Sequence, residues 1–278
     1  MKGIIIKTIS NDFLVSAKDK EYLCKARGIF KLNKIIPLVG DNVIFDEQKK
    51  IITEIEPRKN ELIRPSVANV DYAIIVTSVK EPNFDTVLLD KMLTIVSYNK
   101  IEPIIYLTKL DLLDKKETNN IQMYINYYKR IGYKVVNKKE DLISLIKNKT
   151  VVFAGQSGAG KSTLLNKIRP DLKLKTNEIS IALGRGKHTT RHTQLYKIDN
   201  SFIVDTPGFS KIDFIDMKKI DIRDNMKEMF DNLEKCKYRD CMHDNEDGCH
   251  IIELVKENKI LPSRYNNYIS FIRGIKND

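Results

Sequence analysis

One stretch limits what this chain can fold into more than any other. Residues 155–163 read GQSGAGKST and match the pattern G-x-x-x-x-G-K-[ST]. The apolar residues 151–154 precede it and predict a strand, and the residues from 161 onward predict a helix, which is the context that a phosphate-binding loop requires. The chain therefore needs an α/β domain in which backbone N–H groups of the loop surround phosphate oxygens.

Within this phosphate loop, we expect Lys161 to reach the β- and γ-phosphates of a nucleotide, which also makes it a catalytic residue. We expect the Ser162 hydroxyl to bind Mg²⁺. The alternative, a chance glycine-rich turn, leaves the strand and the helix on either side unexplained. The predicted phosphate-binding residues are Gly155, Gln156, Ser157, Gly158, Ala159, Gly160, Lys161, Ser162 and Thr163.

A second predicted strand, 201–204, ends in the sequence DTPG, which begins at Asp205. An aspartate at the carboxyl end of such a strand holds Mg²⁺ in phosphate-loop proteins, usually through water. We therefore expect Asp205 at the magnesium ion and the backbone N–H of Gly208 near the γ-phosphate. A plain Asp-Thr-Pro-Gly turn is the alternative.

The segment 183–196 is rich in basic residues and glycine and predicts a mobile loop. In a GTPase this loop supplies a threonine to Mg²⁺ and the γ-phosphate; we expect Thr190 in this role, with Thr189 as the alternative. Ser210 stands where many GTPases place a glutamine that orients the attacking water, and it is too short for that. A neutral His188 imidazole can hydrogen-bond the water, although a solvent-exposed loop histidine is an equal alternative.

A guanine base is read by a carboxylate that accepts from its N1–H and 2-amino groups. Residues 108–111 read TKLD and follow the apolar stretch 101–107. We expect Asp111 to accept both guanine donors and Lys109 to lie along the base. Thr108 replaces the more usual asparagine and cannot form all the hydrogen bonds of an amide, so we expect modest guanine affinity.

The order of these motifs along the chain is unusual. The TKLD sequence comes first, then the phosphate loop, then the threonine-containing loop, and then DTPG. An ordinary GTPase has its base-reading motif last. Because domain termini often lie close together, the same sheet can be threaded from a different start. The order therefore predicts a circularly permuted GTPase domain.

The regions flanking the motifs differ in pattern. Residues 1–66 contain short strand-like stretches with polar or Gly/Pro punctuation, which predicts an OB-type β-barrel; an SH3-like barrel fits nearly as well. Residues 67–210 alternate apolar strands with helices, which predicts a parallel sheet covered on both faces. Residues 211–278 predict a mostly helical region. The helix expected at 84–99 has an apolar face made of Val87, Leu88, Met92, Ile95 and Val96.

A cysteine cluster interrupts the last region. Cys236, Cys241, His243 and Cys249 have the spacing C-x4-C-x-H-x5-C. Three thiolates and an imidazole are a ligand set that structural zinc prefers, with no position left open for catalysis. Buried free cysteines beside a surface histidine are the alternative, and His250 is a competing imidazole.

The chain carries 48 Lys and Arg against 37 Asp and Glu, a net charge of +11. This excess suits a polyanionic partner, nucleic acid first, although a basic surface without a partner is equally compatible. No apolar run approaches the length of a membrane span, and the first residues do not form a signal peptide. We therefore expect a cytoplasmic protein with no membrane partner.

Taken together, these motifs resemble the RsgA (YjeQ/YloQ) family of bacterial small ribosomal subunit biogenesis GTPases. The resemblance covers essentially the whole chain, and the metal-ligand spacing matches the family through His243. It implies an RNA-binding OB fold, a permuted GTPase domain and a zinc-binding domain. It further implies a monomer that binds the 30S subunit and its 16S rRNA late in maturation and, stimulated by the subunit, hydrolyses GTP to GDP.

Two other function classes share part of this pattern. A phosphate-loop ATPase or kinase would keep GQSGAGKST but would not need TKLD. A nucleotide-gated RNA-binding protein without hydrolytic activity would share every binding motif. Competition between GTP and ATP separates the first from a GTPase, and phosphate release in the presence of 30S subunits separates the second.

Overall fold

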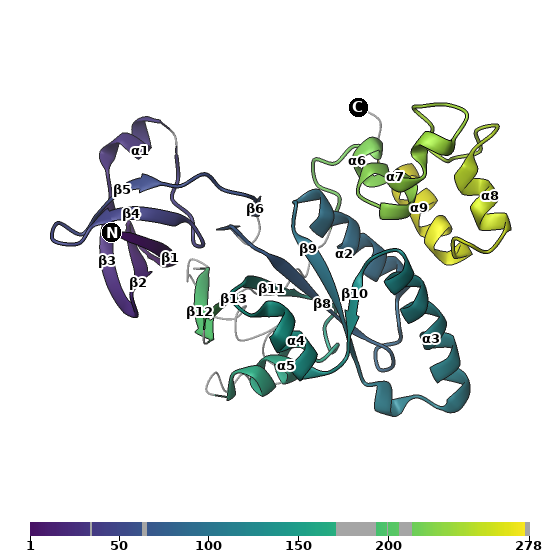
Figure 1. The fold of residues 1–278 in the computed structure, drawn as a ribbon, viewed down its shortest axis with the longest axis horizontal. Coiled ribbons are helices and arrows are strands. Elements are labelled where there is room, and N and C mark those ends of the chain that lie inside the picture. Colours follow the sequence, from purple (N-terminus) through teal and green to yellow (C-terminus); the bar gives the residue numbers. More distant parts are fainter. Residues whose placement is uncertain (34, 63–65, 171–192, 199, 206–212, 276–278) are drawn as a thin grey trace.

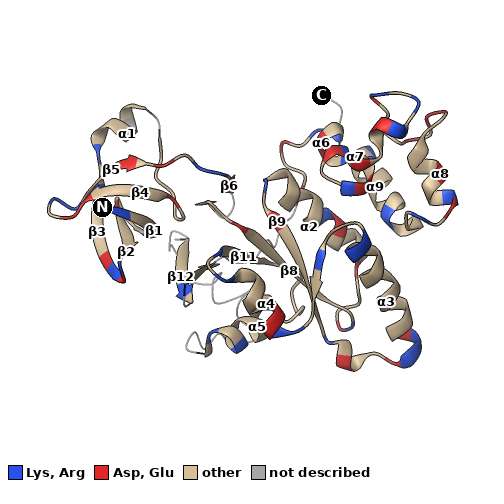
Figure 2. Cartoon of the chain, viewed as in Figure 1, with Lys and Arg blue, Asp and Glu red and all other residues tan. Residues whose placement is uncertain are grey.

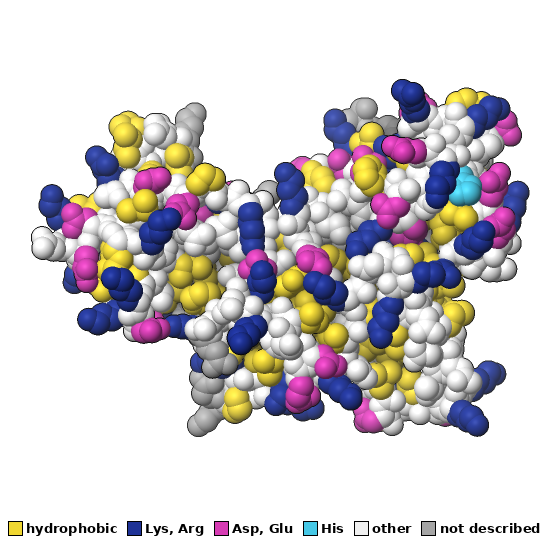
Figure 3. All heavy atoms as spheres, in the orientation of Figure 1, with side chains coloured by type: hydrophobic (Ala, Val, Ile, Leu, Met, Phe, Trp, Pro, Cys, Tyr) yellow, Lys and Arg dark blue, Asp and Glu magenta, His cyan; other side chains and the backbone are white. Residues whose placement is uncertain are grey.

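The computed structural model describes residues 1–278 except 34, 63–65, 171–192, 199, 206–212 and 276–278. Figure 1 shows three parts along the chain: an N-terminal β-barrel, a central α/β domain and a C-terminal group of helices. In Figure 3 the barrel and the C-terminal helices project from the central domain with a notch between them. The predicted fold class, a barrel followed by a parallel-sheet domain and a helical region with a cysteine cluster, is confirmed.

The barrel closes through pairings between strands that are distant in sequence. Strands β1, β2 and β3 form an antiparallel meander, β3 pairs with β5 in parallel, and β4 pairs with both β5 and β1. Side chains alternate inward along each strand, and Ile5, Val15 and Ile52 are fully buried in the barrel core. The strands are β1 (Lys2–Ile9), β2 (Asp12–Ala17), β3 (Lys20–Ala26), β4 (Asn42–Asp46) and β5 (Ile51–Ile55).

Two small features of this part have no counterpart in the sequence predictions. The helix α1 (Gly28–Leu32) connects β3 to the loop before β4, and a two-residue ladder joins β6 (Glu61–Leu62) to β7 (Val67–Ala68). Elements this short carry no hydrophobic period, so sequence patterns do not reveal them.

The central sheet has the strand order β10-β9-β8-β11-β13-β12. All neighbours pair in parallel except β12 and β13, which form an antiparallel hairpin. Parallel neighbours require crossover connections, and helices provide them. The strands are β8 (Tyr72–Ser78), β9 (Glu102–Thr108), β10 (Lys134–Val136), β11 (Thr150–Ala154), β12 (Gln194–Ile198) and β13 (Ser201–Asp205).

Helices cover both faces of this sheet, as predicted (Figure 1). Ile75 of β8 packs in the same core cluster as α2 (Thr86–Tyr98) and α3 (Lys115–Arg130). Its neighbour Ile74 points to the opposite face, into a cluster with α4 (Lys139–Ile146) and α5 (Lys161–Ile168). Both faces of the strands are buried, which explains their continuous apolar runs.

The apolar face predicted for the first of these helices is partly wrong. Val87 is 49% exposed, whereas Leu89 and Leu93 are buried. The Asp85 carboxylate accepts a hydrogen bond from the Leu88 N–H and caps the start of the helix. The helix packs against α9 (Pro262–Gly274) as well as against the sheet, so its buried face is wider than the predicted one and differs from it. Asp90 is also fully buried on this face, which no hydrophobic pattern predicts.

Strand β12 begins inside the segment 183–196 that was expected to be a mobile loop, and for residues 194–196 this expectation is wrong. Leu195 is the one buried side chain of this strand, so its sequence lacks an apolar signal. The strand also pairs with β1 of the barrel, which makes one continuous 11-stranded sheet of the barrel and the central domain. The barrel is therefore an extension of the nucleotide-binding sheet.

The C-terminal region is helical and packs against the central domain. Its core includes Met226, Ile251 and Tyr268, all fully buried, and α9 lies along α2. Figure 2 shows basic residues on the barrel, on α3 and on these helices, interspersed with acidic ones. Among the described residues, no helix is long and apolar enough to cross a membrane. The helices are α6 (Lys219–Asp224), α7 (Lys227–Asp231), α8 (His250–Lys256) and α9 (Pro262–Gly274).

A buried ionic network joins this region to the central domain. Arg264 of α9 lies 2.6 Å from the Asp90 carboxylate of α2 and 2.7 Å from the Glu228 carboxylate of α7. The side chains of all three residues are almost fully buried. Three further groups donate hydrogen bonds to the two carboxylates: the hydroxyls of Tyr127 and Tyr128 and the amide of Asn267. Because every buried charge has partners, the network fixes the orientation of α9 against α2.

Replacing the central cation of this network should destabilise the protein strongly. Arg264→Met leaves the Asp90 and Glu228 carboxylates buried without a counter-ion, and removal of one partner from a buried ion pair costs about 3–5 kcal/mol. Urea denaturation followed by circular dichroism measures the loss. Arg273→Met on the same helix is the matched control, because its ion pair with Asp244 is exposed and should contribute far less. Equal losses for the two variants would contradict the structural role of the network.

Candidate functional site

The candidate nucleotide site lies at one edge of the central sheet. The carboxyl ends of β8, β9, β11 and β13 meet there, because all four strands run in parallel. The phosphate loop follows β11, the TKLD sequence follows β9, and DTPG begins at the last residue of β13. Ligands of open parallel sheets bind at this edge, outside the carboxyl ends of the strands.

The phosphate loop approaches its neighbouring strand so closely that its first residue must be glycine. Gly155 has φ +139°, and a Cβ added there would lie 2.2 Å from the carbonyl oxygen of Val76 on β8. Gly158 and Gly160 also have positive φ, at +77° and +94°. The glycines predicted from the motif therefore serve the backbone path of the loop itself.

Two side chains at the start of α5 lie where the motif predicts. The Lys161 ammonium donates hydrogen bonds to the carbonyl oxygens of Gly155 and Gln156, the latter at 2.9 Å. Burial lowers the pKa of Lys161. Ser162 is buried in the first turn of the helix. An anion at this end of the helix would meet unpaired backbone N–H groups and the positive end of the helix dipole.

The TKLD sequence is hydrogen-bonded directly to the phosphate loop. The Thr108 hydroxyl donates a 2.7 Å hydrogen bond to the carbonyl oxygen of Ala159, and a Cβ on Gly160 would lie 3.6 Å from the Thr108 methyl carbon. We expected a threonine to be a poor substitute for asparagine at this position. The structure shows that the shorter side chain still connects the end of β9 to the loop.

Lys109 and Asp111 of the same sequence lie in the turn that follows β9. Lys109 has left-handed backbone angles, with φ +62°, and its ammonium donates to the carbonyl oxygen of Glu81. Asp111 lies in the short helix η1 (Leu110–Leu112) and is exposed. Its carboxylate is therefore accessible to a ligand at the sheet edge.

The contribution of the loop between β8 and α2 was missed in the sequence analysis. Besides the Glu81 carbonyl, this loop contributes Pro82, whose Cδ would lie 3.6 Å from a Cβ on Gly158. A small cavity beside it is lined by the end of β8, the first turns of α2 and Gln156. The sequence signal was available, because Glu-Pro directly after an apolar strand marks a turn at the carboxyl edge of the sheet.

Several predicted residues lie outside the described part of the chain. They are His188, Thr189, Thr190, Gly208 and Ser210. The backbone of Asp205 is described as the last residue of β13, but its side chain is not. Their predicted roles stay predictions.

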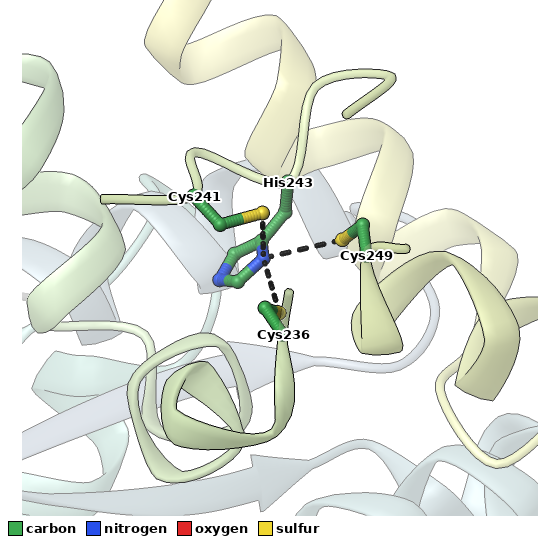
Figure 4. A group of neighbouring side chains, drawn as sticks. All are labelled: Cys236, Cys241, His243 and Cys249. Atoms are coloured by element: carbon green, nitrogen blue, oxygen red, sulfur yellow. Dashed lines mark hydrogen bonds between the residues drawn. The ribbon is translucent and has the colours of Figure 1, made fainter. Parts of the chain in front are cut away.

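A second candidate site is the cysteine cluster of the C-terminal region. Figure 4 shows the sulfur atoms of Cys236, Cys241 and Cys249 around one nitrogen of His243. The Nδ1 atom lies 3.6, 3.4 and 3.4 Å from these three sulfurs, and the four ligand atoms all lie within 4.8 Å of one another. A tetrahedral zinc ion with ordinary bond lengths would separate nitrogen and sulfur by about 3.5 Å. The cluster can therefore hold a metal ion.

The orientation of the imidazole also fits a metal ligand. The Nε2 atom of His243 lies 3.1 Å from the carbonyl oxygen of Met229, so Nε2 carries the proton and Nδ1 presents its lone pair to the sulfurs. Burial lowers the pKa of His243, which keeps the ring neutral. The competing His250 lies outside the cluster and contacts Glu253.

Burial disfavours ionisation of two of the thiols, since it raises the pKa of both Cys241 and Cys249. Burial, with the neighbouring Cys249 thiol, raises the pKa of Cys241 to about 12. A bound metal ion reverses this effect, because it stabilises the thiolate directly.

The sequence of this chain matches a family of known GTPases along nearly its whole length. The model of the RsgA GTPase domain matches residues 55–215, and the model of the RsgA N-terminal domain matches residues 2–52. Among curated proteins, the small ribosomal subunit biogenesis GTPase RsgA 2 of Oceanobacillus iheyensis is 44% identical over 285 residues, which span 99% of this chain and 97% of that protein. The RsgA of Enterococcus faecalis is also 44% identical, over 100% of this chain and 96% of its own.

Solved structures show the same architecture. The crystal structure of YloQ, described as a circularly permuted GTPase, superposes with a TM-score of 0.85 at 37% identity and covers 100% of this chain and 96% of its own. YjeQ from Thermotoga maritima superposes with a TM-score of 0.86 at 32% identity, with 99% of each chain covered. This chain therefore shares both its permuted order of motifs and its fold with a solved GTPase that is circularly permuted.

Proposed function

This chain belongs to the RsgA family of GTPases, and from that premise we propose that it hydrolyses GTP while bound to the small ribosomal subunit. The observation that carries the nucleotide part of the proposal is the hydrogen bond from Thr108 to Ala159. It connects the predicted base-reading segment to the phosphate loop, so one nucleotide can contact both.

We propose that the phosphate loop holds the β- and γ-phosphates. Lys161 exchanges the carbonyl oxygens of Gly155 and Gln156 for phosphate oxygens, and Ser162 provides a hydroxyl to Mg²⁺. Asp205 and Thr190 complete the magnesium site. The ion, when bound with GTP, neutralises charge that develops on the β–γ bridge as the bond to the γ-phosphate breaks.

The base is guanine in this proposal. The exposed Asp111 carboxylate accepts from the N1–H and the 2-amino group of the ring, and the Lys109 stem packs along it. The backbone N–H of Gly208 lies at the γ-phosphate, and His188 orients the attacking water. Hydrolysis transfers the γ-phosphoryl group to that water and leaves GDP and phosphate.

We propose 16S rRNA as the contact on the subunit. The net charge of +11 supports a polyanionic partner, as does the segment 167–197, which follows the phosphate loop in the sequence and carries 8 Lys and Arg against 2 acidic residues. The barrel of residues 1–66 offers a second RNA surface, next to the GTPase domain of residues 67–210. The protein acts as a monomer in the cytoplasm, where its partner is assembled.

The cluster in residues 211–278 holds structural zinc in this proposal. Cys236, Cys241, His243 and Cys249 are all its ligands, so no position remains for a substrate. The ion stabilises the turn that carries Cys236 and Cys241, and the start of α8. The distances between sulfur and nitrogen support this assignment.

A substitution at the predicted base reader should change nucleotide preference. Asp111→Asn replaces one of two acceptors by a donor, so affinity for GTP should fall about tenfold or more while affinity for xanthosine triphosphate rises. Fluorescence titration with labelled nucleotides measures both. Asp114→Asn is the control, because asparagine caps α3 as well as aspartate does and should leave the preference unchanged. If Asp111→Asn binds GTP as tightly as the wild type, TKLD is an ordinary turn and Asp111 does not recognise guanine.

Loss of one metal ligand should remove zinc and disorder the C-terminal region. Protein purified without chelators should contain about one zinc ion per chain by atomic emission, and Cys241→Ser should contain almost none. Amide exchange should then rise across residues 230–255, while nucleotide affinity changes little. Cys24→Ser is the control, because this buried cysteine lies in the barrel and should keep the zinc content normal. Wild-type protein free of zinc would refute the assignment.

Small ribosomal subunits should accelerate GTP hydrolysis by binding the basic loop, residues 183–196. On saturating small subunits, His188→Ala should retain GTP binding but slow single-turnover hydrolysis about 100-fold, the scale for a lost general base. The acceleration should weaken steeply as salt rises, because phosphate contacts release counterions. His192→Ala, a second histidine in the same loop, is the matched control and should keep the wild-type rate. A His188→Ala rate within about twofold of wild type would assign the water-orienting group to the subunit.

A further inference from the structure

One position of the sheet connects the barrel to the predicted magnesium aspartate. Gln194, the first residue of β12, pairs on one side with Asp205 of β13. On its other side the same residue pairs with Lys7 of β1, a barrel strand. The three residues form a single row across the sheet, so the backbone of Asp205 is two strands away from the barrel.

The row continues into the barrel and ends beside an irregularity. Lys7 pairs with Leu14 of β2, and the register of β1 against β2 shifts between Ile5 and Lys7. Lys7 with Gln194 is the one register pair between β1 and β12 among the described residues. The bulge locally disrupts the ladder of β1, so few neighbouring hydrogen bonds support the pairing of Lys7 with Gln194.

Two side-chain contacts hold the other end of β12. The Lys197 ammonium lies 2.5 Å from the Asp19 carboxylate in the turn between β2 and β3 of the barrel. The Arg169 guanidinium, at the end of the phosphate-loop helix α5, donates to the Lys197 carbonyl oxygen. Strand β12 therefore contacts the barrel and the nucleotide-binding helix at the same residue.

We propose that this junction makes the barrel part of the support of the magnesium site, with Gln194 as the positioning residue. Gln194 is held in the sheet by both neighbours, so a change in its pairing with Lys7 alters the position of Gln194 and, through their pairing, the backbone of Asp205. By thermodynamic reciprocity, Mg²⁺ and GTP bound at the site change the preferred position of the barrel. A small ribosomal subunit that binds the barrel in turn changes the affinity of the site for Mg²⁺. The inference rests on the proposed function for the identity of the magnesium ligand and of the partner.

Amide hydrogen exchange on the full-length wild-type protein tests the junction without any subunit. The protein is saturated with a non-hydrolysable GTP analogue, with Mg²⁺ in one sample and with EDTA in the other. We expect Mg²⁺ to slow exchange in β1 about fivefold or more, the lower range of allosteric coupling, and to leave β3 unchanged. Unchanged β1 exchange, while Mg²⁺ slows exchange in residues 201–205, overturns the inference.

A reversible cross-link tests whether the junction must move on the subunit. Lys7→Cys with Gln194→Cys places two thiols at directly paired positions, and Ser16→Cys with Glu21→Cys is the control pair inside the barrel. The readout is the ratio of subunit-stimulated to basal single-turnover hydrolysis, before and after reduction. We expect oxidation to lower this ratio about fivefold or more in the junction pair, with recovery on reduction and no change in the control.

The failures of the two proposals can be told apart. An oxidised junction pair with the same ratio as its reduced form overturns the coupling, even if the subunit stimulates hydrolysis normally. A wild-type protein that subunits do not stimulate contradicts the proposed function instead. The exchange experiment then still decides the coupling, because it uses only nucleotide and Mg²⁺.

Discussion

The carbonyl oxygen of Val76 lies so close to Gly155 that no side chain fits between the phosphate loop and β8. This approach fixes the loop against the sheet, and the rest of the candidate site is built on it. Thr108 donates to the loop from β9, and Lys109 donates to the Glu81 carbonyl in the loop after β8. Three segments are thus connected through backbone carbonyls, whose positions depend on the fold and little on side-chain rotamers.

The permuted order of the motifs changes which parts of the molecule are connected to this site. Because the chain enters the sheet at β8, the hairpin of β12 and β13 is followed by the helical region and bordered by the barrel. The edge that an open sheet would expose at β12 is covered by β1. The permutation thus leaves the strand beside the predicted magnesium aspartate in contact with the barrel.

The two flanking parts are attached in different ways. The helical region is fixed to α2 by a fully buried ionic network around Arg264. His243 of the Cys₃His cluster contacts the Met229 carbonyl oxygen in the helix that also carries Glu228. The barrel region is joined through the register pair of Lys7 with Gln194, the exposed Lys197–Asp19 ion pair and hydrogen bonds from Asn60 to the Val70 and Lys100 carbonyl oxygens. Desolvated charges with complete partners resist displacement, whereas exposed pairs contribute little. The attachment of the helical region to α2 therefore resists displacement more than the pairing of β1 with β12 does.

Local patterns alone determined much of this protein. The phosphate loop, TKLD, the Cys₃His set and the central strands could be predicted, because each depends on residue types at fixed spacing or on a hydrophobic period. The row from Lys7 through Gln194 to Asp205 could not, nor could the burial of Asp90 beside Arg264, 174 residues away. The bond from Thr108 to Ala159 could not be predicted either. These contacts join residues far apart in sequence, and their chemistry is decided only when the packed sheet removes water and brings them together.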